Sequence, residues 1–534
     1  MKKILSILLI FTFSFSLCSC KNKKSPDAQI IKYNLESEPK SLDPQIANDY
    51  SSNIVIMNLF EGLTRADSEG NALPGVAYSW DANSDFTSYT FHLRNDATWA
   101  NKNKTPVTAE DFVFGFQRAL DKKTNSPLAV SLYCIKNAKK VNLSSGASYE
   151  LGVHSVDNNT LKIDLEYSNK DFPKLVSTSP TMPCNKEFFE SCTGQYGLEN
   201  KTVLGNGPFK IKSRYGWDHF NSIQLFKNEN YVGAQKPIPA GISFSIGKDI
   251  SNAVDLIKDE VLDAALLPIG QFKKAQNENF NMVSFDDTIW GLTFNISDSL
   301  FSNLSLRKSI ITSLNRTYIL SNIPDNCSIT ENIVLKKLLI GSKTFEEVSQ
   351  KDMYLKEDRS SNTYLDRGLK ELKLKSLPKV TIICLNTPEV KAMVSNIIEN
   401  LNNKLNYHFN MNPISLSELN SKINNSDYQV AVAPMTAQSD SALEFLSMFR
   451  SNNEKNILKL KSVEYDKMLE KASFAEPEES IKLLVEAERY LHNNAMIYPL
   501  YVESRYFASA KNLSGIIFHK YKRGIDFMLA KKQK

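Results

Sequence analysis

The amino-acid sequence predicts a mixed α/β protein of several domains, and two kinds of pattern support this class. Strands in which apolar residues occupy every second position are predicted at 89–94, 161–165 and 242–246. Residues 380–385 form a further, buried strand, which is followed by a helix opened by Pro388 and by a strand at 407–411. This order is that of a βαβ unit, a right-handed element of largely parallel sheets.

Two more amphipathic helices are predicted from their first turns. Thr108 is a suitable N-cap, and Glu110 and Asp111 follow it, where acidic side chains interact favourably with the helix dipole. The apolar stripe of this helix consists of Phe112, Phe116, Ala119 and Leu120. Pro477 lies near the start of the second helix, and residues 497–502 form the strand after it.

The first twenty residues have the organisation of an export signal. Lys2 and Lys3 form a positively charged start, and residues 4–17 form an apolar stretch that is too short to cross a bilayer comfortably. The stretch ends in Leu17-Cys18-Ser19-Cys20, which resembles a bacterial lipobox.

This resemblance implies a protein that is secreted across the cytoplasmic membrane and anchored by lipid, in the periplasm or on the outer face of the cell membrane. We expect residues 1–19 to be a lipoprotein signal peptide, Cys20 to be lipidated and residues 20–29 to form a tether. The alternative is a secretory signal that is cut near Ser19 and leaves a free thiol.

Composition and charge exclude several classes of protein. The net charge is +5, and removing Lys2 and Lys3 with the signal takes it from +5 to +3, with no dense basic block for nucleic acid. Five cysteines remain after residue 20, so at least one thiol stays free. Cys184 and Cys192 are close enough in sequence to form a disulfide, but the sequence does not decide this.

The sequence contains no pattern that predicts catalysis or a cofactor. It has no Gly-x-Ser-x-Gly motif and no Walker-type loop, and its six histidines show no spacing typical of a metal site. We interpret Gly205-Asn206-Gly207-Pro208 as a turn into a strand, because Pro208 lacks the backbone donor that a phosphate loop needs. The acidic pair Asp286-Asp287 is interpreted as part of a solvated face. We therefore expect a protein that is not an enzyme and holds no metal.

Several motifs follow one another along almost the whole chain. They include Ser37-Glu38-Pro39-Lys40-Ser41-Leu42-Asp43-Pro44, Leu59-Phe60-Glu61-Gly62-Leu63, Thr105-Pro106-Val107-Thr108, Gly205-Asn206-Gly207-Pro208-Phe209 and Tyr498-Pro499-Leu500-Tyr501. Asn295, Leu306-Arg307, Asn315-Arg316 and Ala487-Glu488 extend the series. In order and spacing, these motifs resemble the oligopeptide-binding (OppA-like) solute-binding proteins of ABC importers, bacterial solute-binding protein family 5.

The resemblance implies a type II periplasmic-binding-protein-like fold, in which two lobes joined by a hinge carry an extra α/β domain. Lobe 1 (domain I) would comprise residues 30–52, 181–290 and 503–534, the additional domain (domain II) residues 53–180, and lobe 2 (domain III) residues 291–502. A short peptide would be captured between the lobes and delivered to an ABC permease in the cytoplasmic membrane. We expect the protein to act as a monomer without a cofactor.

The resemblance also implies positions for the ligand site. Glu38 in the opening motif and Phe114 in the helix after Thr108 would lie at the cleft, and Trp290 would form an aromatic wall near the lobe crossover. The alternatives are a surface carboxylate for Glu38 and core packing for the two aromatic residues.

The chain departs from the family pattern in the run 431–440. Peptide binders typically carry a Gly-Trp-x-Ala-Asp-Tyr-type run there, whose backbone pairs with the peptide and whose aspartate binds the peptide amine. Pro434 and Met435 take the Gly-Trp positions, and Gln438 takes the place of the aspartate. The predicted ligand residues of this run are Met435, Thr436, Gln438 and Asp440, of which Asp440 replaces the aspartate if the loop shifts by two residues.

Three hypotheses about function follow from these observations. The first is a peptide-binding subunit of an importer, and the second is the same role with a cell-wall peptide, a blocked peptide or another small solute. The third is a surface adhesin built on the same scaffold, because a fold does not fix a function. A smaller departure is the turn at 99–105, which is longer than the family usually has.

Overall fold

The computed structural model describes residues 29–144, 150–212, 215–268, 270–323, 326–340, 343–349, 360–406, 409–437, 439–453, 456–473, 475–519 and 524–533. The expected signal peptide, Cys20 and most of the tether lie outside these residues, as does Gln438. None of the helices described in these ranges is long and apolar enough to cross a membrane.

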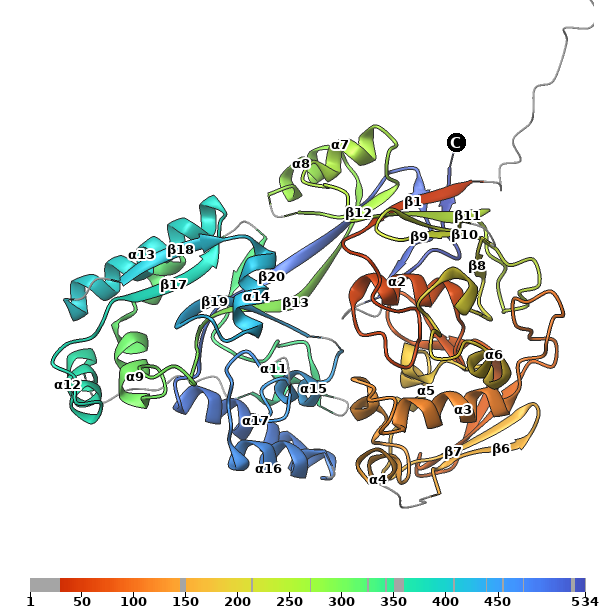
Figure 1. Cartoon of the computed structure of the whole chain (residues 1–534), viewed down its shortest axis with the longest axis horizontal. Helices are drawn as coiled ribbons and strands as arrows, with labels where there is room; N and C mark the ends of the chain where they lie inside the picture. Colours follow the sequence, from red (N-terminus) through yellow and green to blue (C-terminus); the bar gives the residue numbers. More distant parts are fainter. Residues whose placement is uncertain are drawn as a thin grey trace, which may run out of the picture.

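One sheet runs through the whole structure and connects its two lobes (Figure 1). Its main strand order is β18-β17-β19-β13-β20-β12-β1-β11-β10-β8. The two longest strands, β13 (Asn281–Phe294) and β20 (Ile497–Ser509), pair antiparallel in the middle and pass from one lobe to the other. We call these two strands the crossover.

Lobe 1, on the right in Figure 1, is built around one end of this sheet. Its strands are β1 (Ile30–Leu35), β8 (Phe209–Ile211), β9 (Trp217–Asp218), β10 (Ser222–Lys227), β11 (Gly241–Ile246) and β12 (Ala264–Leu266). Its helices include α2 (Tyr50–Leu59), α7 (Ala253–Lys258) and α8 (Phe272–Asn277).

A smaller sheet with its own helices packs below lobe 1 in Figure 1. Its strand order is β4 (Ala77–Ala82), β5 (Ser88–Leu93), β7 (Thr160–Asp164) and β6 (Val153–Asp157). The helices beside it are α3 (Ala109–Leu120), α4 (Ala138–Leu143), α5 (Phe172–Leu175) and α6 (Lys186–Ser191).

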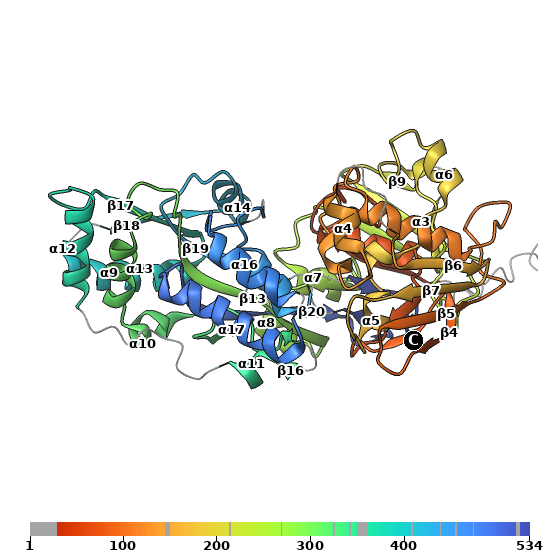
Figure 2. The same cartoon turned by 90° about the horizontal axis from the view of Figure 1, so that it is seen from below.

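Lobe 2 is built around the other end of the large sheet, with helices on both sides of it (Figure 2). Its strands are β14 (Cys327–Ile329), β17 (Val380–Leu385), β18 (Phe409–Ile414) and β19 (Val430–Thr436). Its helices include α9 (Leu304–Ser313), α12 (Ser361–Glu371), α13 (Pro388–Leu405), α14 (Leu416–Asn424), α15 (Ala442–Ser447), α16 (Val463–Ala472) and α17 (Pro477–Asn493).

The mixed α/β class and the predicted elements are confirmed. The alternating segments form β5, β7 and β11, and the βαβ unit is β17-α13-β18 with its two strands parallel. α13 continues to Leu405 and ends at Asn406 in a left-handed conformation with φ 51°, and the described part of the second strand begins at Phe409. Residues 407–408 of the predicted strand lie outside the described residues. Thr108 is the N-cap of α3, and the carboxylate of Asp111 accepts its backbone N–H at 2.8 Å.

Motif residues of the N-terminal half form buried ion pairs between distant segments. Arg118 on α3 donates to both carboxylate oxygens of Asp43, at 3.1 and 2.6 Å, and its guanidinium lies 3.9 Å from the ring centre of Phe189. Arg65 likewise pairs with Glu61 at 3.1 Å and with Asp526. Breaking a buried pair by removing one partner costs about 3–5 kcal/mol, so these contacts hold the opening and closing segments of the chain in place.

The segment Gly205-Asn206-Gly207-Pro208 is the predicted turn into a strand, and it leads into β8. The side chain of Asn206 accepts the N–H of Glu61 at 3.0 Å and donates to its carbonyl at 2.9 Å. A Cβ atom on Gly205 would lie 2.1 Å from the carbonyl oxygen of Leu59, so only glycine permits this approach.

Motif residues of lobe 2 bind backbone groups in the same way. Arg307 donates to the carbonyls of Phe301 at 2.6 Å and Asn494 at 2.9 Å. The carboxylate of Glu488 on α17 is fully buried and accepts the N–H groups of Ile333 at 2.7 Å and Val334 at 2.9 Å.

Cys184 and Cys192 do not form a disulfide, and both belong to one buried cluster with Tyr196. The described cysteines are all free thiols, and burial raises the pKa of Cys184 to about 12.

We predict that Glu488 makes the stability of the protein depend on pH. Burial raises the pKa of Glu488 to about 8 from an ordinary value of 4.5, although its two backbone hydrogen bonds act in the opposite direction. Between these two values the unfolded chain binds fewer protons at this group than the folded chain, so the free energy of unfolding falls as pH rises, by at most about 1.4 kcal/mol per pH unit.

The variant Glu488→Gln keeps an acceptor for the two backbone groups and cannot ionise. Thermal unfolding of both proteins is measured from pH 5 to pH 9. The two proteins should be equally stable at pH 5, and the stability of the unsubstituted protein should fall more steeply as the pH rises. Equal slopes for the two proteins would contradict the prediction.

Candidate functional site

The crossover is the candidate functional site, because it is the place where polar side chains of both lobes meet. The strands β13 and β20 pair from Asn281↔Ser509 to Thr293↔Ile497. Their register shifts between Asp286 and Thr288 and again between Trp290 and Gly291. Such irregularities bend a strand and redirect its side chains.

At the first irregularity, a buried carboxylate meets an arginine of the other strand. The side chain of Asp287 is 1% exposed, and both of its oxygens accept hydrogen bonds from Arg505, one of them at 2.9 Å. Burial alone would lower the pKa of Arg505, but the charge of Asp287 raises it above its ordinary value. The interpretation of Asp286-Asp287 as a solvated face is therefore wrong for Asp287, because this side chain is buried. Its partner Arg505 lies 218 residues away in the sequence, so no local pattern indicated the pair.

Farther along the two strands, Glu503 and Trp290 form a second polar contact. The indole Nε1 of Trp290 donates to Oε2 of Glu503 at 2.5 Å, and its ring stacks on Tyr501 with ring centres 6.2 Å apart. Burial raises the pKa of Glu503, which the hydrogen bond from Trp290 opposes. Glu503 is half-buried, whereas Trp290 is 4% exposed and contributes to the core of lobe 2.

The register of three strands decides which side chains share a face with Glu503. Thr288 of β13 lies opposite Thr436 of β19 on one side and opposite Glu503 on the other, and the two threonine hydroxyls are 3.0 Å apart. Met435 lies opposite Ile289 and points to the other face, where it is 1% exposed in the core. Thr436 and Glu503 therefore face the same side of the crossover, and Met435 faces the opposite side.

The structure places the other predicted ligand residues in separate surroundings. Glu38 accepts three hydrogen bonds, from Trp217 Nε1 at 2.9 Å, His219 Nδ1 at 2.6 Å and the N–H of Phe220 at 2.8 Å, which fix the turn after β9. Phe114 packs edge-on against Phe189 with ring centres 5.7 Å apart.

Asp440 is half-buried, and its carbonyl accepts the N–H of Leu339 at 2.5 Å. Of the predicted ligand residues that the structure describes, Trp290 and Thr436 lie on one face of the adjacent strands β13 and β19, and Met435 lies on the opposite face of β19. Their roles in binding a ligand stay predictions.

Sequence reasoning missed several residues of the crossover. Thr288 and Arg505 belong to no local motif, Tyr501 was identified only as the end of the motif 498–501, and Glu503 was assigned only as the first residue of a lobe segment. The strand 497–502 was predicted after the helix that Pro477 opens, but its continuation to Ser509 and its partner β13 were not.

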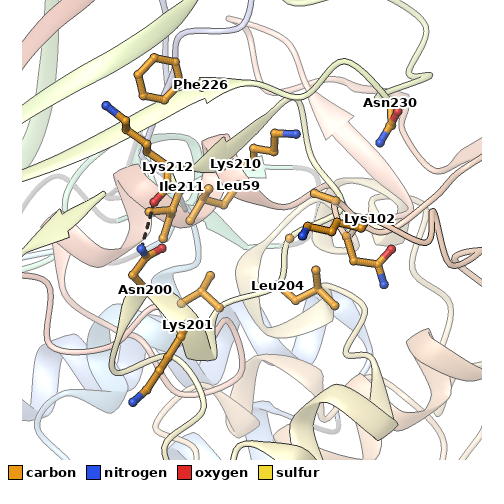
Figure 3. A pocket seen from close by; sticks show the side chains of 14 residues that line it. Leu59, Lys102, Asn200, Lys201, Leu204, Lys210, Ile211, Lys212, Phe226 and Asn230 are labelled. Carbon is orange, nitrogen blue, oxygen red and sulfur yellow. Dashed lines mark hydrogen bonds between the residues drawn. The ribbon is translucent and has the colours of Figure 1, made fainter. Parts of the chain in front are cut away.

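Two cavities lie outside the crossover, and no predicted ligand residue lines either of them. One, of about 590 Å³, lies beside the edge strand β8 of lobe 1 and is lined by lysine and asparagine side chains (Figure 3). The other, of about 730 Å³, lies against α3 and β6 and is lined by residues that include Gln117, Leu151 and His154.

Comparison with known proteins places this architecture in a family. The chain is 27% identical to the oligopeptide-binding protein OppA of Bacillus subtilis over 96% of each sequence. Its structure is similar to that of Listeria monocytogenes OppA bound to peptide, with a TM-score of 0.77, 22% identity and coverage of 95% of this chain and 99% of the other. It is also similar to the murein tripeptide-binding protein MppA of Escherichia coli, with a TM-score of 0.75, 22% identity and coverage of 95% and 99%.

Residues 71–456 match the bacterial extracellular solute-binding proteins, family 5 middle region. This match covers more than half of the chain, and the structural neighbours share its two-lobed α/β fold. The predicted family and the type II periplasmic-binding-protein fold are thus confirmed, and the family consists of solute-binding proteins rather than enzymes. The chain belongs to the bacterial extracellular solute-binding proteins of family 5.

Proposed function

We propose that this protein is the lipid-anchored substrate-binding component of an ABC importer, and that it captures short oligopeptides between its lobes for delivery to a permease. The observation that carries the proposal is the similarity to an oligopeptide-binding relative over 96% of both chains, which includes both crossover strands. In this proposal Cys20 holds the monomeric protein at the membrane, and the peptide is the only solute bound.

The proposal assigns the lobes as the sequence predicts. Residues 30–52, 181–290 and 503–534 act as lobe 1, residues 53–180 as the additional domain and residues 291–502 as lobe 2. The boundaries at 290 and 502 fall inside β13 and β20, next to the second irregularity in their register, which supports this position as the hinge. Closure requires that the ligand binds the closed state more tightly than the open one.

An extended peptide suits the part of the crossover where the half-buried Thr436 lies opposite the buried Thr288. Peptide recognition by main-chain hydrogen bonds gives affinity without selecting a sequence, and hydroxyl groups such as those of Thr288 and Thr436 accept and donate such bonds. We further propose that Glu503 binds the peptide amine in place of the aspartate that the family carries at the position of Gln438. In support, one oxygen of Glu503 bonds Trp290 while the group remains half-buried, and a carboxylate in such a position forms strong bonds to an ammonium.

A second candidate is the same role with a cell-wall peptide as ligand. The similarity to the murein tripeptide-binding protein of Escherichia coli favours it, together with the glutamine at position 438. The two candidates differ in whether a free peptide amine is required.

We predict that short peptides stabilise the protein against heat. A ligand that binds only the folded state adds RT ln(1 + [L]/Kd) to the free energy of unfolding, about 2.7 kcal/mol at a concentration of 100 times Kd. Pools of di- to hexapeptides are added to the chain that begins at Lys21, and its melting temperature is measured. A failure of every pool to raise it would contradict peptide binding, and a response only to murein peptides would favour the second candidate.

We predict that Glu503→Gln weakens the binding of free peptides about tenfold or more, because it removes a charge-assisted bond to the amine. The affinity for the same peptides with an acetylated amine should not change. Asp286→Asn is the matched control, since it removes a carboxylate of the same strand pair that is already bound to Lys337 at 2.7 Å and to Ser504 at 2.6 Å. The affinities of the three proteins are measured by calorimetric titration. If Glu503→Gln lowers the affinity for free and acetylated peptides equally, Glu503 has no role in binding the amine.

A further inference from the structure

The lysine-lined cavity of lobe 1 has a charge that the proposed function does not use. Its lining includes Lys102, Lys201, Lys210 and Lys212, and no aspartate or glutamate belongs to the described residues that line it. Lys201 pairs with Glu199 at 3.3 Å, but Lys102, Lys210 and Lys212 form no ion pair with any residue that the structure describes. Three of the four lysines at the cavity therefore carry a positive charge that no described acidic side chain pairs with.

The arrangement of the lysines favours an extended anionic partner over a small free anion. Figure 3 shows the amino groups of Lys102, Lys201, Lys210 and Lys212 well apart around the cavity rather than converging on one point. A bound phosphate would require donors that converge at hydrogen-bond distance. A surface that carries many separate negative groups can place one group near each of these lysines.

The turn that the sequence analysis singled out as longer than usual supplies one of these lysines. Residues 99–105 place Lys102 at the cavity, and the turn is fixed by the side chain of Asn101, which bonds the N–H of Thr105 at 3.0 Å and its hydroxyl at 2.8 Å. The N–H of Ala100 also donates to the carbonyl of Gly205 at 2.9 Å. Lys102 therefore extends from a fixed turn toward the two lysines of β8 and its end.

The position of β1 on the same side of lobe 1 as this cavity points to the partner. The register aligns Ile30 of β1 with Gly241 of β11, Gly241 with Phe226 of β10, and Phe226 with Lys210 of β8. Lys210 is thus three strand spacings from Ile30, or about 14 Å. Figure 1 shows β1 and β11 side by side in lobe 1, with β10 and β8 beyond them on the side away from lobe 2.

The expected anchor lies within reach of the same end of lobe 1. Cys20 precedes Ile30 by ten residues, a stretch of chain that spans at most about 35 Å. A lipid attached there keeps lobe 1 near the headgroups, where each lysine adds to the attraction of anionic lipids.

We propose that the lysine-lined cavity of lobe 1 docks on anionic phospholipid headgroups and forms a second membrane contact beside the lipid anchor. The proposal rests on the lipid anchoring in the proposed function. This contact orients lobe 1 on the membrane and leaves the crossover, with its ligand groups, clear of it.

Vesicle binding of the unlipidated protein tests the contact directly. The chain that begins at Lys21 contains every residue that the structure describes, because these residues begin at 29. Its partition is measured by co-sedimentation with vesicles of phosphatidylcholine alone and with vesicles that contain about 30% phosphatidylglycerol. We expect binding only to the anionic vesicles and a marked loss on raising the salt from about 50 to about 200 mM.

The triple variant Lys102→Gln, Lys210→Gln, Lys212→Gln should bind the anionic vesicles at least tenfold more weakly, since each lysine near such a surface contributes about fivefold. The matched control is Lys370→Gln, Lys375→Gln, Lys379→Gln, which removes the same charge from exposed lysines of lobe 2 and should bind like the unsubstituted protein. Equal binding of the two triple variants would overturn the proposal, and so would displacement from vesicles by free phosphate at constant ionic strength, which would assign the cavity to a soluble anion.

Melting temperatures of both triple variants establish that they fold, and their response to peptides separates the two proposals. Loss of vesicle binding with an unchanged peptide response supports the docking surface. Failure of the peptide response in all proteins contradicts the proposed ligand and leaves the vesicle result to be judged alone.

Discussion

The structure depends on the pairing of β13 with β20, because this pair is the continuous connection between the two halves of the sheet. Strands of lobe 2 add to β13 on one side, and strands of lobe 1 add to β20 through β12 on the other. A relative movement of the lobes must therefore twist or bend this pair rather than separate it. The two register irregularities are where the ladder is already interrupted, so bending there breaks the fewest backbone bonds.

The ion pair between Asp287 and Arg505 explains how the first irregularity remains stable. A residue excluded from the ladder leaves its carboxylate buried, and an unpaired buried charge costs several kcal/mol. Arg505 neutralises it from the opposite strand, and the carbonyl of Asp287 accepts the N–H of Ala437 at 2.8 Å. The bulge is in this way tied to both β20 and the end of β19, which couples lobe 2 to the crossover.

Sequence analysis found the elements and the family because both depend on local pattern. Alternation identified β5, β7 and β11, and motifs such as Gly205-Asn206-Gly207-Pro208 were visible because their residues are contiguous in the sequence. Several of these motif residues bind backbone groups or form buried ion pairs, and Asn206 and Arg307 are examples. The family resemblance was therefore recognised from residues that stabilise the fold rather than from residues of the candidate ligand site.

The candidate site was less predictable, since it depends on strand register. A register shift of one residue exchanges the two faces of a strand, so Met435 and Thr436 could not be assigned to a face before β13 was known as the partner of β19. Glu38 shows the same limit for a loop: its carboxylate is bound to a turn 179 to 182 residues away, which no local pattern records.

The separation between the crossover and the lysine-lined cavity has a mechanical consequence. The cavity lies beside β8, at the far edge of the sheet, and the strands between it and β20 are β10, β11, β1 and β12. These strands share one buried core with α2, and close-packed cores move as rigid units. A contact at β8 therefore fixes lobe 1 without straining the irregularities of β13 and β20. In the proposed arrangement lobe 2 would be the moving part, and its closure over a ligand would need no release of lobe 1 from the membrane.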